Sequence, residues 1–102
     1  MKVFTQSVNF NADKELITYT DEKVSGLVKY HDKIVDAEVF LKVLNISDKE
    51  NKSTEIKINI PGKELIVKRE AKTFEEGVNS AVDNLKRQLK RSKEKLRDSI
   101  TS

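Results

Sequence analysis

The longest periodic pattern of apolar residues lies near the C-terminus. Thr73 and Glu76 form a T-x-x-E capping box, in which each side chain can satisfy a free backbone N–H of the first helical turn. The apolar positions that follow recur at spacings of three, four and seven, as one face of a helix requires. They are Val78, Ala81, Val82, Leu85, Leu89 and Leu96. The pattern predicts an amphipathic helix over residues 73–98.

The N-terminal third predicts a strand followed by a second helix. Residues 2–8 are rich in β-branched and aromatic types, which favours a strand. Asp13, or alternatively Asn11, can cap a helix that runs to about Tyr30. Its predicted apolar side consists of Leu16, Ile17, Val24, Leu27 and Val28.

The middle of the chain predicts three further strands. Residues 35–44 alternate, with Val35, Ala37, Val39, Leu41 and Val43 on one face. A polar loop over residues 45–52 precedes a second alternating run at Ile56, Ile58 and Ile60. Pro61 and Gly62 suit the central positions of a type II turn, and residues 64–70 form the last strand.

The order of predicted elements is therefore β-α-β-β-β-α, which indicates an α+β fold. Each helix has one apolar stripe and the strands have one apolar face. This favours a four-stranded mixed sheet with two helices packed on one face, the first two strands being parallel. At 102 residues the chain is long enough for one core, so we expect a single domain over residues 1–102.

Charge is distributed very unevenly along this chain. The formal net charge is only +3, but residues 1–85 hold 13 basic and 15 acidic side chains while residues 86–102 hold 7 and 2. Most of these cations lie opposite the apolar stripe of the C-terminal helix and cover three turns, more than complementation of the helix dipole would require. This basic face has two interpretations. It is either a solvated surface without a binding role or a binding surface for a polyanion.

The sequence offers little for catalysis or cofactor binding. His31 is the only histidine and falls on the apolar side of the first helix, where a partly buried structural role is expected. The three glycines are scattered, there is no cysteine, and the adjacent carboxylates on the helices point apart. We predict a protein that is not an enzyme, with no cofactor, metal or small-molecule substrate. No stretch has the length of a membrane span or signal peptide, so we expect a cytoplasmic protein without a membrane partner.

Two stretches of this chain, ELITYTDEKVSGLVKYHDKI followed by VDAEVFLKV, and FEEGVNSAVDNLKRQLKRSKEKL, resemble the ribosome hibernation promoting factor family. The family is also called ribosome-associated inhibitor, ribosomal subunit interface protein or sigma-54 modulation protein. The resemblance covers nearly the whole chain and includes the fold. Its most specific positions are Leu16, Lys23, Leu27, Tyr30, Ile34, Asp83, Leu85, Arg87, Gln88, Leu89, Lys93, Lys95 and Leu96.

The resemblance implies binding to ribosomal RNA of the small subunit, and so to the whole ribosome. Family members occupy the channel of messenger and transfer RNA near the decoding centre and inhibit translation under stress or in stationary phase. Lys23, Lys42, Arg87, Arg91 and Lys95 match basic positions of the family. Two family lysines are replaced, by Gly26 and Asn84, whereas Lys86 and Lys90 add charge.

The first helix adds a stripe of aromatic and basic residues beside its apolar face. Tyr19, Lys23, Gly26 and Tyr30 are spaced by four, three and four. Their rings can stack on exposed bases or can simply border the core. We expect Lys23 and Tyr30 to form one continuous surface with Arg87, Arg91 and Lys95. The full set of predicted RNA-contacting residues is Lys23, Tyr30, Lys42, Lys86, Arg87, Lys90, Arg91, Lys93 and Lys95.

Two other function classes use the same basic helix. A generic double-stranded-RNA-binding module has a related layout, but its key lysines lie at the start of the last helix, where this chain has Glu75 and Glu76. An interaction domain for an acidic protein partner is the second alternative. The sequence places the charge at the wrong end of the helix for the first alternative and does not exclude the second.

Overall fold

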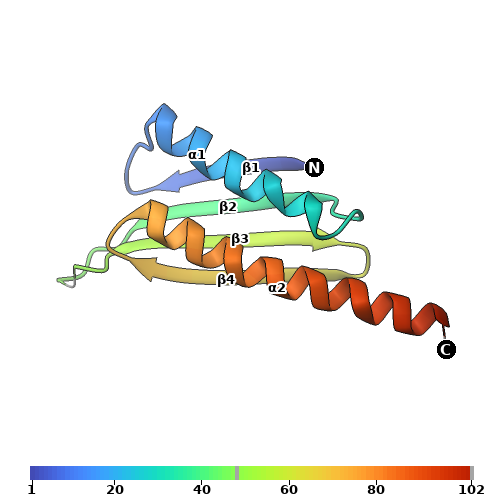
Figure 1. The fold of residues 1–102 in the computed structure, drawn as a ribbon. Coiled ribbons are helices and arrows are strands. Elements are labelled where there is room, and N and C mark those ends of the chain that lie inside the picture. Colours follow the sequence, from blue (N-terminus) through green and yellow to red (C-terminus); the bar gives the residue numbers. More distant parts are fainter. Residues whose placement is uncertain (48, 102) are drawn as a thin grey trace.

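The computed structural model describes residues 1–47 and 49–101, with side chains up to residue 94. The predicted site residue Lys95 and the predicted core residue Leu96 therefore have side chains outside the described part. The elements follow the predicted order (Figure 1). They are β1 (Lys2–Val8), α1 (Lys14–Ser25), the 3₁₀ helix η1 (Gly26–Lys29), β2 (Asp36–Val43), β3 (Lys52–Ile60), β4 (Lys63–Ala71) and α2 (Phe74–Thr101).

The strands form one mixed sheet in the order β1-β2-β3-β4. β1 runs parallel to β2, with Lys2 opposite Asp36, and the other two pairs are antiparallel. Gly62 has a φ of 75°, which the third position of the predicted type II turn between β3 and β4 requires. The predicted α+β fold and strand directions are confirmed.

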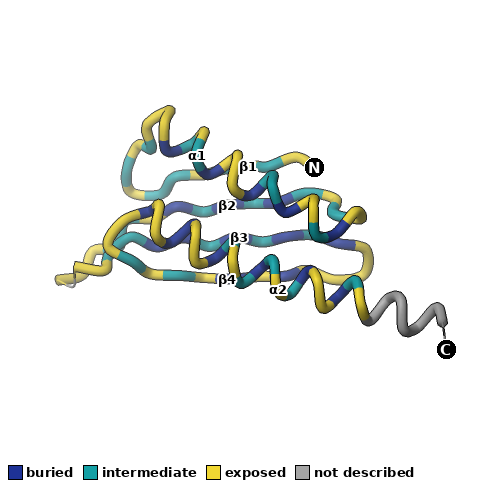
Figure 2. The backbone as a smooth tube through the Cα atoms, in the orientation of Figure 1, coloured by how far each residue is buried: buried dark blue, intermediate teal, exposed yellow. Residues whose placement is uncertain are grey.

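Both helices lie over the same face of the sheet (Figure 1). Alternate residues of the strands and one stripe of each helix meet between the layers, while the opposite positions remain at least partly accessible (Figure 2). The fully buried side chains include Val24, Leu27, Val39, Leu41, Ile56, Ile58, Val78, Leu85 and Leu89. The predicted apolar stripe of α2 is thus confirmed up to Leu89.

The end of the first helix differs from the prediction. The α-helix stops at Ser25 and continues as η1, which turns by about 120° per residue instead of about 100°. Because each residue of η1 turns farther around the axis, Val28 points away from the core while Leu27 stays buried. Val28 is 46% exposed. Val35 lies before β2 and is 61% exposed, so these two predicted core residues are wrong. His31 is buried, as expected for a structural residue, and its Nδ1 accepts the Lys33 backbone N–H at 3.0 Å.

Side chains at both helix starts fix how the chain enters the helical layer. The Asp13 carboxylate accepts the Leu16 N–H at 2.8 Å, and the Thr73 hydroxyl accepts the Glu76 N–H at 3.2 Å. The predicted cap at Asp13 and the Thr73 half of the predicted capping box are therefore present. α2 then approaches β3 closely at Gly77, where a Cβ atom would lie 2.7 Å from Thr54 Oγ1. This contact brings the first turns of α2 against the sheet.

Candidate nucleic-acid interface

Two shallow hollows lie between the α1–η1 segment and α2, and Tyr30 lines both of them. The first, of about 330 Å³, carries the cations Lys23, Lys29 and Lys86 together with Glu22 and Asp83. The second, of about 380 Å³, carries Lys29, Lys90 and Lys93 together with Glu94. We call the two hollows and the ring between them the Tyr30 groove. Its cations outnumber its acids.

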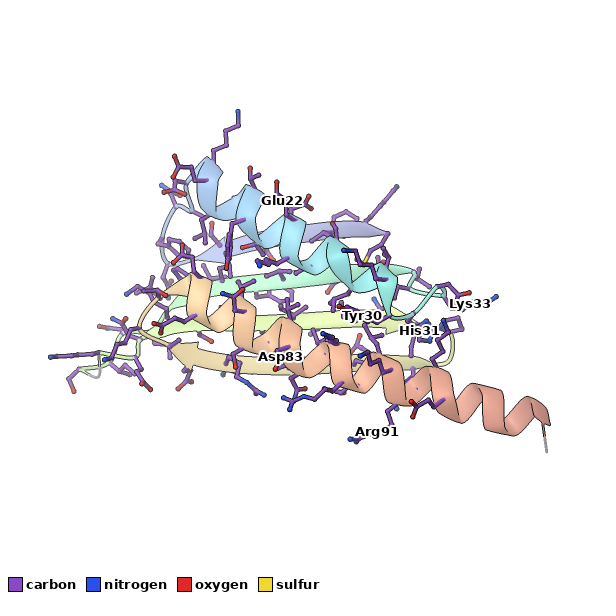
Figure 3. The ribbon with its side chains drawn as sticks, in the orientation of Figure 1. Glu22, Tyr30, His31, Lys33, Asp83 and Arg91 are labelled. Carbon is purple, nitrogen blue, oxygen red and sulfur yellow. The ribbon has the colours of Figure 1, made fainter. Side chains whose placement is uncertain are left out.

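Tyr30 brings η1 and α2 together at the centre of this groove (Figure 3). Its half-buried ring packs against the core, and the Nζ atoms of Lys86 and Lys90 lie 5.0 and 5.3 Å from the ring centroid. Such cation–π contacts hold ammonium groups beside an aromatic face. The interpretation that the ring borders the core is confirmed, and base stacking on it stays a prediction.

Tyr19 connects the two helices farther along the same interface. Its hydroxyl donates to Asn79 Oδ1 at 2.8 Å, and Lys23 Nζ lies 5.6 Å from its ring centroid. The ring is half-buried against the core. Tyr19 therefore ties α1 to α2 and orients Lys23 at the mouth of the groove.

Lys29 is a groove residue that the sequence reasoning missed. On a continuous α-helix it would point about 120° away from Lys23, at about 100° per residue. The tighter turn of η1, at about 120° per residue, reduces this difference to about 60°. Sequence reasoning did not anticipate the 3₁₀ turn, which directs Lys29 toward the stripe that contains Lys23.

The cations of α2 divide between its two flanks. With Leu85 and Leu89 facing the core, about 100° per residue places Lys86 and Lys93 on the same flank. This flank faces α1 and η1, because Lys86 contacts the Tyr30 ring and Lys93 lines a hollow with Lys29. Arg91 projects from the opposite flank, away from α1 (Figure 3). The predicted single surface that joins Lys23 and Tyr30 to Arg91 would therefore have to pass around the outer crest of α2, and it stays a prediction. The lysines meet Tyr30, whereas Arg91 points elsewhere.

Arg87 lies on the outer crest of α2, opposite the core. Its guanidinium is 3.7 Å from the Asp83 carboxylate, and both side chains are about two-thirds exposed, at 68% and 69%. An exposed pair of this kind contributes roughly 0–1 kcal/mol and is screened by salt. Arg87 therefore remains available to a stronger anion.

Lys42 does not join the other predicted contacts. It follows Glu38 and Phe40 on the face of the sheet that the helices leave open, whereas Leu41 is buried under the helices. Lys42 is exposed there, near the end of β2. The sheet separates it from the Tyr30 groove.

The described residues contain neither a cluster of metal ligands nor a membrane-spanning helix. No group of three or more His, Asp or Glu side chains within them could hold a metal ion. Across the same part of the chain, no helix is both long and apolar enough to cross a bilayer.

This chain matches a known protein family over nearly its whole length. The family model described as Sigma 54 modulation protein / S30EA ribosomal protein matches residues 3–97. The chain belongs to this family. The predicted resemblance to ribosome hibernation factors is thereby confirmed, since curated relatives carry that name.

Two relatives show the extent of this family relationship. A ribosome hibernation promoting factor of Pseudomonas putida is 30% identical over 95 residues, which is 93% of this chain and 89% of that protein. A ribosome hibernation promotion factor of Deinococcus radiodurans is 30% identical over 86 residues, 83% of this chain. The match spans only 45% of the Deinococcus protein.

Solved structures of two further proteins share this fold. The N-terminal domain of Thermus thermophilus Protein Y superposes with a TM-score of 0.72 at 25% identity, covering 88% of this chain and 93% of that one. A ribosomal subunit interface protein from Coxiella burnetii gives a TM-score of 0.76 at 18% identity, covering 91% and 98%. The second likeness concerns the fold alone.

Proposed function

We propose that this family member is a ribosome hibernation factor. It binds ribosomal RNA of the small subunit in the channel of messenger and transfer RNA, near the decoding centre, and inhibits translation under stress or in stationary phase. It acts in the cytoplasm on the assembled ribosome, through the domain of residues 1–102, without catalysis. The observation that carries the proposal is the cluster of cations on α2 and around Tyr30, in a chain whose family is that of ribosome hibernation factors.

The proposed mechanism is occupation of the channel by a preformed, positively charged layer. Lys23 and Lys29 from the first helical segment and Lys86, Lys90 and Lys93 from α2 surround the groove. Such cations neutralise phosphates and release counterions, which gives affinity without base specificity. An unpaired base can stack on the Tyr30 ring once the Lys86 and Lys90 ammonium groups leave the ring for phosphates. Arg87 and Arg91 extend the contact over α2, and Lys95 joins them by family resemblance.

A domain of this shape should recognise assembled ribosomal RNA better than an isolated duplex. Two helices side by side contact several RNA segments at once, whereas a short duplex offers one local surface. The start of α2 also argues against a double-stranded-RNA module, because the residues there are the exposed acids Glu75 and Glu76.

Sedimentation of stationary-phase extract, followed by immunoblotting, tests the proposal directly. We expect the protein to migrate with ribosomes. On purified vacant small subunits, binding should fall with salt at a log–log slope of about −3 to −5, as neutralisation of roughly five phosphates implies. Messenger RNA with initiator transfer RNA should displace it.

Two results would contradict this function. Equal affinity for a short RNA duplex and for the small subunit would favour the generic RNA-binding module. A protein found only at the top of the gradient, with a salt slope near zero, would favour a protein partner.

A further inference from the structure

The flank of α2 that faces β4 has its own set of polar groups, separate from the Tyr30 groove. At about 100° per residue, Ser80, Asn84, Gln88 and Arg91 follow one another along this flank. From Ser80 to Arg91 the helix rises by about 16 Å, at about 1.5 Å per residue. Arg91 projects freely from its far end (Figure 3).

β4 contributes a second arginine at the near end of this flank. Arg69 Nε donates to Ser80 Oγ at 3.1 Å, and Arg69 Nη1 donates to the Lys68 carbonyl at 3.0 Å. A guanidinium has five N–H groups, so three are left without a protein partner among the described residues. Two hydrogen bonds thus hold the group in place while most of its donors remain available. This is a suitable arrangement for an oxyanion.

The groups between the two arginines are neutral hydrogen-bonding amides. The Gln88 amide donates to Asn84 Oδ1 at 2.6 Å, which orders both side chains. The neighbouring acids of β4, Glu64 and Glu70, share the parity of Ile66 and so face the open side of the sheet. Among the described residues, no salt bridge within 4.0 Å joins a carboxylate to Arg69 or Arg91.

The two sides of α2 therefore suit different parts of a nucleic acid. The Tyr30 groove combines hollows, an aromatic ring and lysines, as an unpaired nucleotide requires. The β4-side flank has arginine, serine, asparagine and glutamine but no aromatic ring. Those residue types bind phosphate and sugar oxygens.

We propose that Arg69, Ser80, Asn84, Gln88 and Arg91 form a second RNA-binding surface, which takes the sugar–phosphate backbone of a segment other than the one in the Tyr30 groove. This inference rests on the proposed function. α2 then lies between two RNA segments, and Arg69 of the sheet edge is an additional phosphate-binding residue.

The chain contains no cysteine, so single cysteines can carry a tethered iron chelate that cleaves nearby RNA. Asn84→Cys probes the β4-side flank, Glu94→Cys probes the Tyr30 groove, and Ile66→Cys on the open sheet face is the control. On vacant small subunits we expect Asn84→Cys and Glu94→Cys to cut different segments of the ribosomal RNA. Ile66→Cys should cut neither.

The outcomes separate failure of this inference from failure of the proposed function. Cleavage from Glu94→Cys without cleavage from Asn84→Cys would leave the function standing and overturn the second surface. Cleavage of one shared segment by both probes would also overturn it. No cleavage by any probe, with no association in sedimentation, would overturn both proposals.

Neutralising variants give an independent measurement. Arg69→Gln with Arg91→Gln should reduce affinity for the small subunit at least about tenfold and flatten the log–log salt slope by about 2. Lys2→Gln with Lys68→Gln removes the same charge from the open face and should change neither. Equal effects of the two pairs, at unchanged melting temperature, would show that only net charge matters and would overturn the second surface.

Discussion

The open face of the sheet and the outer surface of the helices are both rich in charged side chains, but they arrange them differently. On the sheet, Glu38 lies opposite Lys57 and Glu55 lies opposite Lys68 in neighbouring strands. Lys57 Nζ is also 4.0 Å from Glu55 and 5.5 Å from the Phe40 ring centroid. Charges of opposite sign therefore neutralise one another on this face.

On α2, by contrast, like charges lie together. Residues 86–94 carry five cations and one acid, Glu94. Lys86 and Lys90 are four residues apart, on neighbouring turns, and both reach the Tyr30 ring. Such a surface favours a polyanion, whereas the sheet face is already neutralised. The number of charges on a face thus says less about binding than their pairing does.

Reversing charge on the helical surface should have the largest effect. Arg87→Glu with Arg91→Glu should abolish association with ribosomes, because two phosphate-binding cations are lost and two anions that repel the RNA backbone replace them. Lys2→Glu with Lys68→Glu is the matched control on the open sheet face and should leave association nearly unchanged. Inhibition in a cell-free translation assay measures both. Full inhibition by the arginine variant would show that RNA binds elsewhere.

Truncating apolar side chains should show a similar contrast in stability. Leu89→Ala leaves a cavity in the core and should lower the free energy of unfolding by about 2–5 kcal/mol. Ile66→Ala on the open face removes a side chain that is already 51% exposed, and should cost less than about 0.5 kcal/mol. Denaturant unfolding followed by circular dichroism gives both values. A comparable loss for Ile66→Ala would mean that the open face is covered in solution.

Two helical glycines offer a smaller test of how tightly the layers pack. Gly77→Ala would place a Cβ 2.7 Å from Thr54 Oγ1, and such overpacking costs about 1–3 kcal/mol, partly offset by about 1 kcal/mol of helix propensity. Gly26→Ala meets no atom within 4 Å and should stabilise the protein by about 0.4–1 kcal/mol. Thermal melts should therefore shift in opposite directions. Stabilisation by Gly77→Ala would show that α2 can move off the sheet freely.

The smallest expected effect concerns Lys42, the one proposed RNA contact on the open face. An exposed ionic contact contributes roughly 0–1 kcal/mol, so Lys42→Glu should weaken small-subunit binding by no more than about fivefold. Lys57→Glu, at a position already paired with Glu55, should weaken it less. Filter binding measures the difference. A loss for Lys42→Glu as large as that for the arginine pair would show that RNA contacts both faces.

The amino-acid sequence by itself determined the order of the elements, most of the core and the location of positive charge along the chain. Alternation and helical periodicity depend on backbone geometry that every strand and helix shares, so Ile56, Ile58, Leu85 and Leu89 could be assigned to the core. The caps at Asp13 and Thr73 are hydrogen bonds between residues close in sequence, so they too could be predicted from the sequence. The position of Lys42 on the open face of the sheet could also have been predicted, because it follows from the same alternation that buries Leu41.

Only the tertiary structure decided which charges meet. Periodicity gives the angle of Lys86 or Arg91 relative to the core, but which flank of α2 lies beside α1 depends on how the helices pack on the sheet. The 3₁₀ turn that brings Lys29 to the groove, and the bond from Arg69 to Ser80, join residues whose relation is set by packing. Contacts between distant segments depend on the whole fold, whereas periodicity depends only on near neighbours along the chain.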